Sequence, residues 1–506
     1  MGTIGRRARE LAVPVVVCAL TLGVYCLYSV GQWRMMASPS WDLAIFTEAA
    51  KSYSQGHWPI VPIKGPGFNL LGDHFHPILV LLGPVYRVFP SGLTLLIVQN
   101  ALLAWSAWPV TRAATRLAGS AGGFVIGLAY GLGWGLQGAV GAQFHEIAFA
   151  VPMLAHGGVA FAQGRYRACM AWLAPMVLVK EDLGLTIMVA GLVLAWRRRT
   201  EGRRALAESR AFAAFGAVAF TITTQVLLPA LNPAGTWAYS LDGSATGAGS
   251  SAGGAVAAKV WPSLIEILTF PSVKIATVLV CVLGAGVVGV ASPWFALVVP
   301  TLAWRFMGSV DFYYGWSSWH YNAVLVPIAS AALLDVLGRA AQWRDRRSAD
   351  EEQALADEAG AAAWRAERLS SWWGTGVISV GVATPLLALA ATAPLLPMWQ
   401  LTSSGFGQDG PRAEAAHQAM AAVPAGSAVE TDITLMARMV PDHEVYWVGS
   451  AKDMDPLPEY VVVDQRSYVW GGRDVTAVGW ATGAHPGHSY ELVFERNGFQ
   501  VAHRTS

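Results

Sequence analysis

The sequence predicts an all-helical, polytopic membrane protein that carries a small extracytoplasmic α/β domain at its C-terminal end. Three observations predict this class. Of the 506 residues, 54% are hydrophobic and only 13% are charged, about half the charged share of ordinary soluble domains. Uncharged apolar runs recur from residue 11 to residue 391, and each helical span needs about 20 such residues. Beyond residue 400, short apolar runs alternate with helical patterns and turn residues.

Basic clusters orient the predicted spans, because positive residues gather on the cytoplasmic side. The clusters lie at residues 6–9, 112–116, 165–167, 197–210 and 339–368. We therefore expect a cytoplasmic N-terminus. Threading helices between the clusters gives about eleven transmembrane helices, which leave the C-terminal end outside. They are predicted near 11–30, 92–111, 121–140, 147–163, 168–179, 183–196, 211–229, 275–290, 293–307, 322–338 and 372–391, with 76–90 as a further, part-inserted helix on the outer side.

Segments between the spans complete a predicted transmembrane domain over residues 1–398. Residues 31–76 form a long outer loop, and 232–258 form a Gly/Ser/Ala-rich outer loop that cannot bury a core. The charged, Ala-rich stretch 341–368 is expected to be a cytoplasmic connector with a short helix.

The predicted α/β domain covers residues 399–506. We expect a helix over Arg412–Val423, strands at Ser427–Val429, Val445–Val448 and Tyr460–Val463, a second helical pattern from Asp432, and a closing hairpin at Asn497-Gly498. Because the domain shows no phosphate-binding glycine motif and no metal-ligand spacing, we expect it to bind a partner or to support the fold.

The first outer loop contains a predicted helix from Trp41 to about Tyr53. Its apolar residues follow helical spacing, so we expect it to lie flat on the membrane surface. Asp42 falls in the first turn, where helix capping alone would account for a carboxylate. Alternatively, Trp41 and Phe46 place this carboxylate at the edge of an apolar site.

Ionisable side chains at membrane depth are costly and usually mark a site. In the predicted topology they gather on the outer side: Asp42, Glu48, Asp73, His74, His76, His145, Glu146, Lys180, Glu181, Asp182, Arg305, Asp311 and His320. The run from Lys180 to Asp182 lies between apolar arms of about 12 and 14 residues, which are too short to cross about 30 Å of hydrocarbon. These charges should be submerged, either in a water-filled cavity or as a self-neutralising structural cluster.

A set of carboxylate and imidazole side chains has two alternative interpretations. Asp73, His74 and His76 fall within four residues and, with His145 and Glu146, could hold a divalent metal ion. No known short zinc spacing is matched, so a hydrogen-bonded polar wall is the alternative.

Two residues near later spans also have alternative interpretations. His320 lies between Trp319 and Tyr321, which suits an interfacial aromatic belt as well as a ligand site. Arg305 could extend to the membrane surface or bind phosphate.

Several motifs resemble those of an uncharacterised membrane family, domain of unknown function 2079 (DUF2079). They are Trp-Asp-Leu-Ala-Ile-Phe at 41–46, Asp-His-Phe-His-Pro at 73–77, Thr-Leu-Leu-Ile-Val-Gln at 94–99, Phe-His-Glu at 144–146, Val-Lys-Glu-Asp at 179–182, His-Tyr-Asn-Ala-Val-Leu-Val-Pro at 320–327, and two tail segments at 423–431 and 459–464. The resemblance implies kinship with the GT-C superfamily of glycosyltransferases. Those enzymes take a sugar from a polyprenyl-phosphate carrier on the outer membrane face and place an acidic residue in a first outer loop.

The resemblance implies roles for the clustered residues. Asp42 would be the catalytic base, and Lys180, with Arg305 or His320, would bind the donor phosphate. The remaining residues would bind sugar hydroxyls, orient the base or hold an optional divalent cation. They are Asp73, His74, His76, His145, Glu146, Glu181 and Asp182. The implied partners are a polyprenyl-phosphate sugar, an envelope glycan or lipid acceptor, and membrane lipid.

Two other function classes remain open at this point. A transporter or flippase for a lipid-linked envelope precursor would show paired repeats with charges near the midplane, whereas this sequence shows no clear repeat. The other open function class is a noncatalytic envelope scaffold. Nucleic-acid binding is excluded, because no basic run outside the membrane-flanking loops is paired with stacking aromatics.

Overall fold

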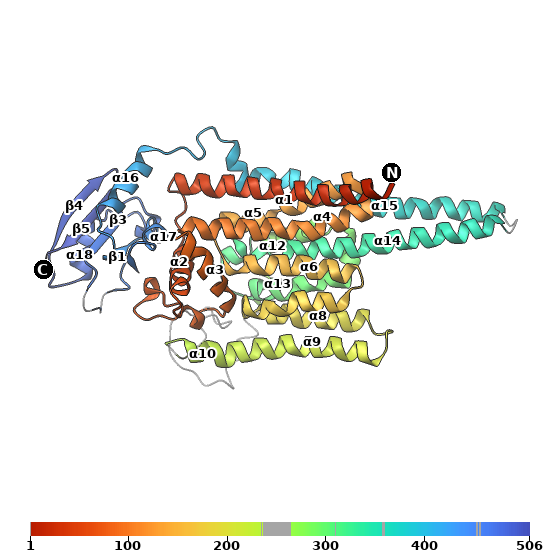
Figure 1. Cartoon of the computed structure of the whole chain (residues 1–506), viewed down its shortest axis with the longest axis horizontal. Coiled ribbons are helices and arrows are strands. Elements are labelled where there is room, and N and C mark those ends of the chain that lie inside the picture. Colours follow the sequence, from red (N-terminus) through yellow and green to blue (C-terminus); the bar gives the residue numbers. More distant parts are fainter. Residues whose placement is uncertain are drawn as a thin grey trace.

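The chain folds into a long helical bundle with a sheet domain at one end (Figure 1). The computed structural model describes residues 2–233, 235, 265–308, 310–356, 360–451, 454 and 457–505. Helix α1 (Gly2–Arg34) begins at the bundle end opposite the sheet, and α14 (Leu325–Ala356) and α15 (Gly360–Thr392) extend beyond that end.

Five helices in the described part of the chain are long and apolar enough to cross a membrane. They cover Glu10–Arg34, Gly92–Gly141, Arg203–Leu231, His320–Arg344 and Gly376–Leu395. Shorter apolar helices lie at Pro77–Val88, Glu146–Ala162, Leu183–Arg197 and Pro271–Gly284. The fold is therefore a polytopic helical one as predicted, while the number of eleven spans stays a prediction.

Helix α4 (Gly92–Gly131) contains a reversal at Gly119, which has φ 73° and ψ −179°. Beyond it, Gly123 and Gly127 pack tightly against Thr115 and Thr111. Residues 16 apart on one straight helix would be about 24 Å apart, so the two arms must run antiparallel. The predicted spans 92–111 and 121–140 are thus a helical hairpin, whose second arm is followed by α5 (Trp134–Gly141).

The remaining bundle helices are α6 (Ala150–Ala162), α7 (Tyr166–Leu173), α8 (Leu183–Arg197), α9 (Arg203–Ile222), α10 (Leu228–Leu231), α12 (Pro271–Gly284) and α13 (Val298–Met307). The span predicted at 275–290 ends early, because Gly286 and Val287 both adopt positive φ after α12.

The structure corrects one predicted connecting segment and describes only a few residues of another. The connector 341–368 is not one short helix, since α14 continues to Ala356 and α15 begins at Gly360. The predicted loop 232–258 lies outside the described residues except at 232, 233 and 235.

Helix α2 (Trp41–Ser54) confirms the predicted outer-loop helix and begins where expected. Every residue from Leu43 to Ala50 is buried, so protein covers the apolar face that was expected to contact lipid, while the position of the helix relative to the membrane surface stays a prediction. The helix contacts α3 (Leu82–Val88), α4 and α17 (Met436–Met439). Protein therefore encloses α2, and the sheet domain forms part of that enclosure.

The sheet domain contains five strands: β1 (Ala428–Thr431), β2 (Glu444–Trp447), β3 (Tyr460–Asp464), β4 (Tyr490–Arg496) and β5 (Phe499–Arg504). Their order is β2-β1-β3-β5-β4. The first three strands are parallel, and β5 pairs antiparallel with β3 and β4. Positive φ at Asn497 and Gly498 closes the predicted β4–β5 hairpin.

Helices α16 (Pro411–Ala421) and α18 (Ala477–Ala484) pack against this sheet. The helical pattern predicted from Asp432 amounts to the single turn of α17. Asp432 itself accepts hydrogen bonds from the backbone N–H groups of Thr434 (2.9 Å) and Asp464 (2.6 Å), so it ties the turn after β1 to the end of β3.

Direct contacts fasten the sheet domain to α2 and α1. Lys51 Nζ donates to the carbonyls of Val440 (2.6 Å) and His443 (2.9 Å). The Trp41 and Trp447 rings meet edge to face at 5.0 Å. The sheet domain thus holds the helix that carries Asp42.

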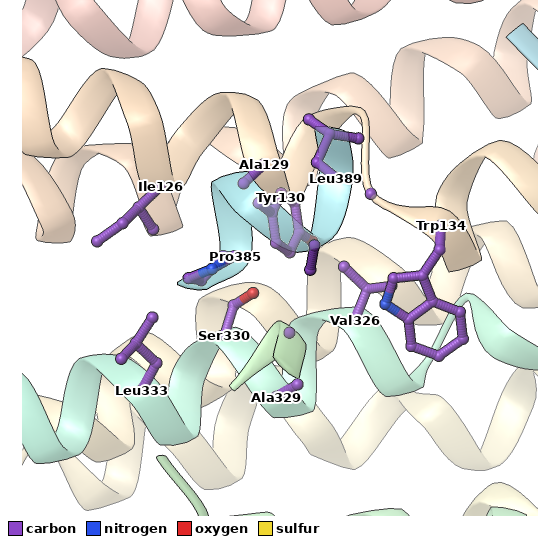
Figure 2. A pocket seen from close by; sticks show the side chains of 13 residues that line it. Ile126, Ala129, Tyr130, Trp134, Val326, Ala329, Ser330, Leu333, Pro385 and Leu389 are labelled. Atoms are coloured by element: carbon purple, nitrogen blue, oxygen red, sulfur yellow. The ribbon is translucent and has the colours of Figure 1, made fainter. Parts of the chain in front are cut away.

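An apolar cavity lies within the bundle between α4, α14 and α15 (Figure 2). Ile126, Leu333, Pro385 and Leu389 line it together with Ser330. Its lining residues include no Asp, Glu, Lys, Arg or His, so it is separate from the charged cluster described next.

Candidate functional site

Five segments that are far apart in the sequence form one network of polar side chains. Each segment lies at or just before the start of a helix or 3₁₀ turn: Asp42 on α2, residues 73–76 before Pro77–Leu81, 145–146 before α6, 180–182 before α8, and His320 before α14. The contacts described below bring these five segments together.

Asp42 is a partly exposed acidic group of the network. Its Oδ2 lies 3.3 Å from His145 Nε2, and 35% of its side chain is exposed. Burial acts to raise the pKa of Asp42, but the charges of His145 and Lys180 outweigh burial and leave the pKa below its ordinary value. The capping bond of α2 is made instead by Ser40, whose Oγ accepts from the Leu43 N–H. Ser40, and not Asp42, therefore provides the side-chain cap of α2.

His145 connects Asp42 to the bundle. Its Nδ1 lies 3.2 Å from the Gln143 carbonyl oxygen, and its ring stacks on His320 with centroids 3.6 Å apart. Both imidazoles are buried, with relative exposures of 2% and 6%. The Phe46 ring covers His145 from α2 at 6.1 Å.

Lys180 and Glu146 form an ion pair beside His145. Lys180 Nζ lies 2.9 Å from Glu146 Oε1, and the side chains are 13% and 2% exposed. Because Glu146 follows His145 directly in the chain, the Asp42 contact and the Lys180 contact share one short segment. Asp42 and Lys180 therefore contact neighbouring residues of one segment, His145 and Glu146.

A second pair involves the 73–76 turn. His74 Nδ1 lies 2.7 Å from Glu181 Oε1, while Glu181 Oε2 accepts from the Phe75 N–H at 3.1 Å. Burial acts to lower the pKa of His74, but the Glu181 carboxylate outweighs it and raises the pKa above its ordinary value. Asp73 pairs with Lys64 at 2.6 Å, a partner that sequence analysis did not identify.

Several buried polar atoms in the network have no hydrogen-bond partner within the described residues. They are His76 Nδ1, His145 Nε2, Glu146 Oε1, Asp182 Oδ1 and both ring nitrogens of His320. His145 Nε2 and Glu146 Oε1 lie within ion-pair distance of Asp42 and Lys180 without hydrogen-bond geometry. Buried polar groups are nearly always satisfied by protein, water or ligand. Their concentration around Lys180 is therefore consistent with a site that binds water or a polar ligand.

The candidate metal ligands are largely engaged in ion pairs. Over the described ranges, no group of three or more His, Cys, Asp or Glu side chains is arranged to hold a metal ion. A divalent cation bound here would have to displace Lys64 from Asp73 or Lys180 from Glu146.

Arg305 has a different environment from the one expected for a phosphate-binding residue. Its side chain is fully buried. Its guanidinium donates to the Tyr313 carbonyl (2.7 Å), Asn322 Oδ1 (2.9 Å) and the Gly315 carbonyl (2.9 Å). These bonds fix the loop before His320, so we correct the phosphate assignment and regard Arg305 as a positioning residue.

Sequence analysis missed two amides that organise the site. Asn322 Nδ2 donates to the carbonyls of Gly315, Trp316 and Ser318. Gln99 on α4 accepts from the His145 N–H at 3.0 Å. The available signal at Gln99 was an amide in an otherwise apolar helical segment, since such a group must find a buried partner.

Comparisons with known proteins gave two kinds of match. A family model described as "Predicted membrane protein (DUF2079)" matches residues 33–499. Two solved structures of ArnT from Cupriavidus metallidurans are similar, each with a TM-score of 0.46. The one bound to undecaprenyl phosphate is 14% identical and covers 96% of this chain and 97% of its own. The apo structure is 16% identical and covers 99% and 98%. No curated protein matches the chain.

Proposed function

The chain belongs to the DUF2079 family of membrane proteins, and from its site we propose that it is a membrane glycosyltransferase. The proposed reaction moves a sugar from a polyprenyl-phosphate donor to a cell-envelope acceptor on the outer face of the membrane. The single observation that carries this proposal is that a partly exposed carboxylate, Asp42, contacts His145, while the next residue, Glu146, forms an ion pair with Lys180.

The proposed chemistry uses these two groups differently. The acceptor hydroxyl attacks the anomeric carbon, the bond from that carbon to the phosphate oxygen breaks, and polyprenyl phosphate leaves. Asp42 takes the hydroxyl proton, which requires an ionised and accessible carboxylate. The lowered pKa of Asp42 and its exposure support this role.

Lys180 would stabilise the negative charge of the departing phosphate. It is 13% exposed and interacts electrostatically with Asp182 and His320, which carry buried polar atoms without a hydrogen-bond partner in the described residues. We propose that the remaining polar side chains of the network bind the sugar hydroxyls. They are Asp73, His74, His76, His145, Glu146, Glu181, Asp182 and His320.

The placement of the sheet domain supports an extracytoplasmic site. The sheet lies at the bundle end that holds α2, whereas α1 begins at the opposite end (Figure 1). If the basic clusters face the cytoplasm, Asp42 and the sheet domain face outward.

Asp42→Asn tests the base assignment in proteoliposomes that contain a radiolabelled polyprenyl-phosphate sugar and an envelope acceptor extract. We expect kcat to fall about 10²–10⁴-fold with little change in donor KM. Glu414→Gln, which alters an exposed carboxylate of the sheet domain, is the matched control. Unchanged transfer by Asp42→Asn would refute the assignment.

Lys180→Met tests the phosphate role in the same assay. Loss of a charge-assisted contact should weaken donor binding about 10–100-fold, and Lys180→Arg should recover part of it. Lys274→Met serves as a control, because Lys274 is a buried lysine of α12 that bonds the Phe306 carbonyl. Equal donor affinity in Lys180→Met and wild type would contradict the proposal.

A further inference from the structure

A pocket outside the polar network lies between α2, α3 and the sheet domain. Its volume is about 320 Å³, within the roughly 300–1,000 Å³ of small-molecule sites. The lining residues are Lys51, Ser54 and Gln55 at the end of α2, Tyr86, Arg87 and Pro90 on α3 and just after it, and Pro441 after α17. This lining shares no residue with the network around Asp42 and Lys180, so the proposed mechanism gives the pocket no role.

The fold brings the two helices of this pocket into close contact. Gly83 of α3 packs on the α2 backbone, where an added Cβ would lie 2.9 Å from the Tyr53 carbonyl oxygen. Because Gly83 has no side chain, α3 can approach α2 this closely. Tyr86 and Arg87 are thereby placed at the pocket that Lys51 also lines. Both helices lie at the sheet-domain end of the bundle (Figure 1).

Two cations line the pocket, and both keep donors available for a ligand. Lys51 Nζ donates to the Val440 and His443 carbonyls, which leaves one of its three N–H groups for a further acceptor. Arg87 is exposed, and its side chain has no hydrogen bond or ion pair within the described residues. A guanidinium presents a planar fork of donors that matches the oxygens of a phosphate group.

Tyr86 adds a buried polar group to the lining. Its side chain is 2% exposed, and its hydroxyl has no hydrogen-bond partner in the part of the chain that the structure describes. Buried polar groups are nearly always satisfied by protein, water or ligand. Glu48, Asp442 and Glu444 act on Lys51 electrostatically, but they do not line the pocket. The lining therefore favours an anion.

The apolar helix Pro77–Val88, which includes α3, carries exposed apolar side chains on one side. Its other side is buried and includes Leu79, Leu82 and Tyr86 at helical spacing. The exposed side consists of Val80, Leu81, Val85, Val88 and Phe89. Contiguous exposed apolar surface marks a contact with protein or membrane. Because Arg87 directly precedes Val88, the basic pocket borders this apolar side.

We propose that the pocket binds the phosphate of an anionic membrane lipid, whose acyl chains lie along the exposed apolar side of α3. Arg87 holds the phosphate through its fork of donors, and Lys51 donates its remaining N–H. A lipid is favoured over a free phosphate ion, because only a lipid also covers the apolar side chains that border the pocket. The lipid site is independent of the proposed glycosyl transfer, since it is tested without donor or acceptor.

Native mass spectrometry of the full-length protein in detergent measures this binding. Dioleoyl phosphatidylglycerol and dioleoyl phosphatidylcholine share acyl chains and differ in net charge, and each is titrated separately. We expect wild type to bind phosphatidylglycerol more tightly, and Arg87→Gln to bind it about 10–100-fold more weakly, because a charge-assisted hydrogen bond is lost. Arg496→Gln, which changes an exposed arginine of the sheet domain, should bind like wild type. Equal binding of both lipids, or equal losses in the two variants, would overturn the proposal.

A second pair of variants distinguishes a lipid from a free ion. Phe89→Ser removes part of the exposed apolar side, whereas Val493→Ser changes an exposed apolar residue of β4. Phosphatidylglycerol binding should weaken about 3–10-fold in Phe89→Ser alone. Without lipid, Arg87→Gln and Phe89→Ser should melt near the wild-type temperature, because both native side chains are exposed.

Thermal unfolding with inorganic phosphate alone provides the remaining arm. A ligand that binds the folded state raises the melting temperature in proportion to its occupancy. We expect phosphatidylglycerol to stabilise wild type and inorganic phosphate at the same concentration to have little effect. Equal stabilisation by both ligands, with Phe89→Ser binding like wild type, would identify a free-ion site and overturn the lipid assignment.

Discussion

At the scale of single residues, burial alone does not set the charge of the site. Asp42 and His74 both lie in the network, yet each favours its charged form because an oppositely charged partner outweighs desolvation. His76 is 1% exposed, and its Nδ1 has no partner among the described residues. Burial lowers the pKa of His76 to about 4, so this ring is neutral near pH 7.

His76→Gln tests this difference through pH-dependent stability. The folded state resists protonating His76, whereas the unfolded chain takes up a proton below about pH 6.5. Stability from the neutral ring is therefore complete above pH 6.5 and is lost as the pH falls toward 4. We expect the melting temperature of wild type to fall more steeply over this range than that of His76→Gln. The exposed His57→Gln should behave like wild type, and parallel curves for His76→Gln and wild type would contradict the account.

Sequence patterns predicted which residues gather but not all of their partners. Asp42 and Lys180 were expected to lie near each other, and in the structure they contact the neighbouring residues His145 and Glu146. The partners of Arg305 and Asp73 depend on loop conformations, which no periodic pattern encodes.

At the scale of elements, single backbone positions decide how the bundle turns. Gly119 reverses α4 with φ 73° and ψ −179°, a conformation open essentially to glycine alone. Both predicted spans are present, but the sequence did not show that they form one hairpin with so tight a turn.

Gly119→Ala should therefore destabilise the protein by about 1–3 kcal/mol, seen as a lower melting temperature in detergent. Gly376→Ala is the matched change, because Gly376 lies within α15 with open space around it. That variant should be neutral or more stable by about 0.5–1 kcal/mol. A Gly119→Ala protein as stable as wild type would show that the reversal is not required.

The predicted outer helix illustrates the limit of amphipathic patterns. The range of α2 was predicted, because its apolar spacing and the Ser40 cap are local signals. Its enclosure was not, since the covering residues of α17 follow some 390 positions later in the chain. An apolar helix face predicts that the face will be buried, but it does not show whether lipid or protein buries it.

At the scale of the whole molecule, the account requires that the sheet domain and Asp42 share the outer side. Impermeant maleimide labelling of single cysteines in intact cells tests this orientation, after the four native cysteines are replaced. We expect Glu414→Cys in the sheet domain to react and Arg204→Cys at the start of α9 to react only after lysis. Both native side chains are exposed, at 61% and 87%. The reverse pattern would place the site in the cytoplasm.

The most direct test of the central claim follows the fate of the donor. Purified wild-type protein in sealed vesicles receives a radiolabelled polyprenyl-phosphate sugar together with an acceptor extract, and both free polyprenyl phosphate and lipid crossing are measured. The account predicts release of polyprenyl phosphate with transfer of its sugar, slowed about 10²–10⁴-fold by Asp42→Asn and unchanged by Glu414→Gln. Accelerated lipid crossing with an intact donor would contradict it and identify a flippase instead.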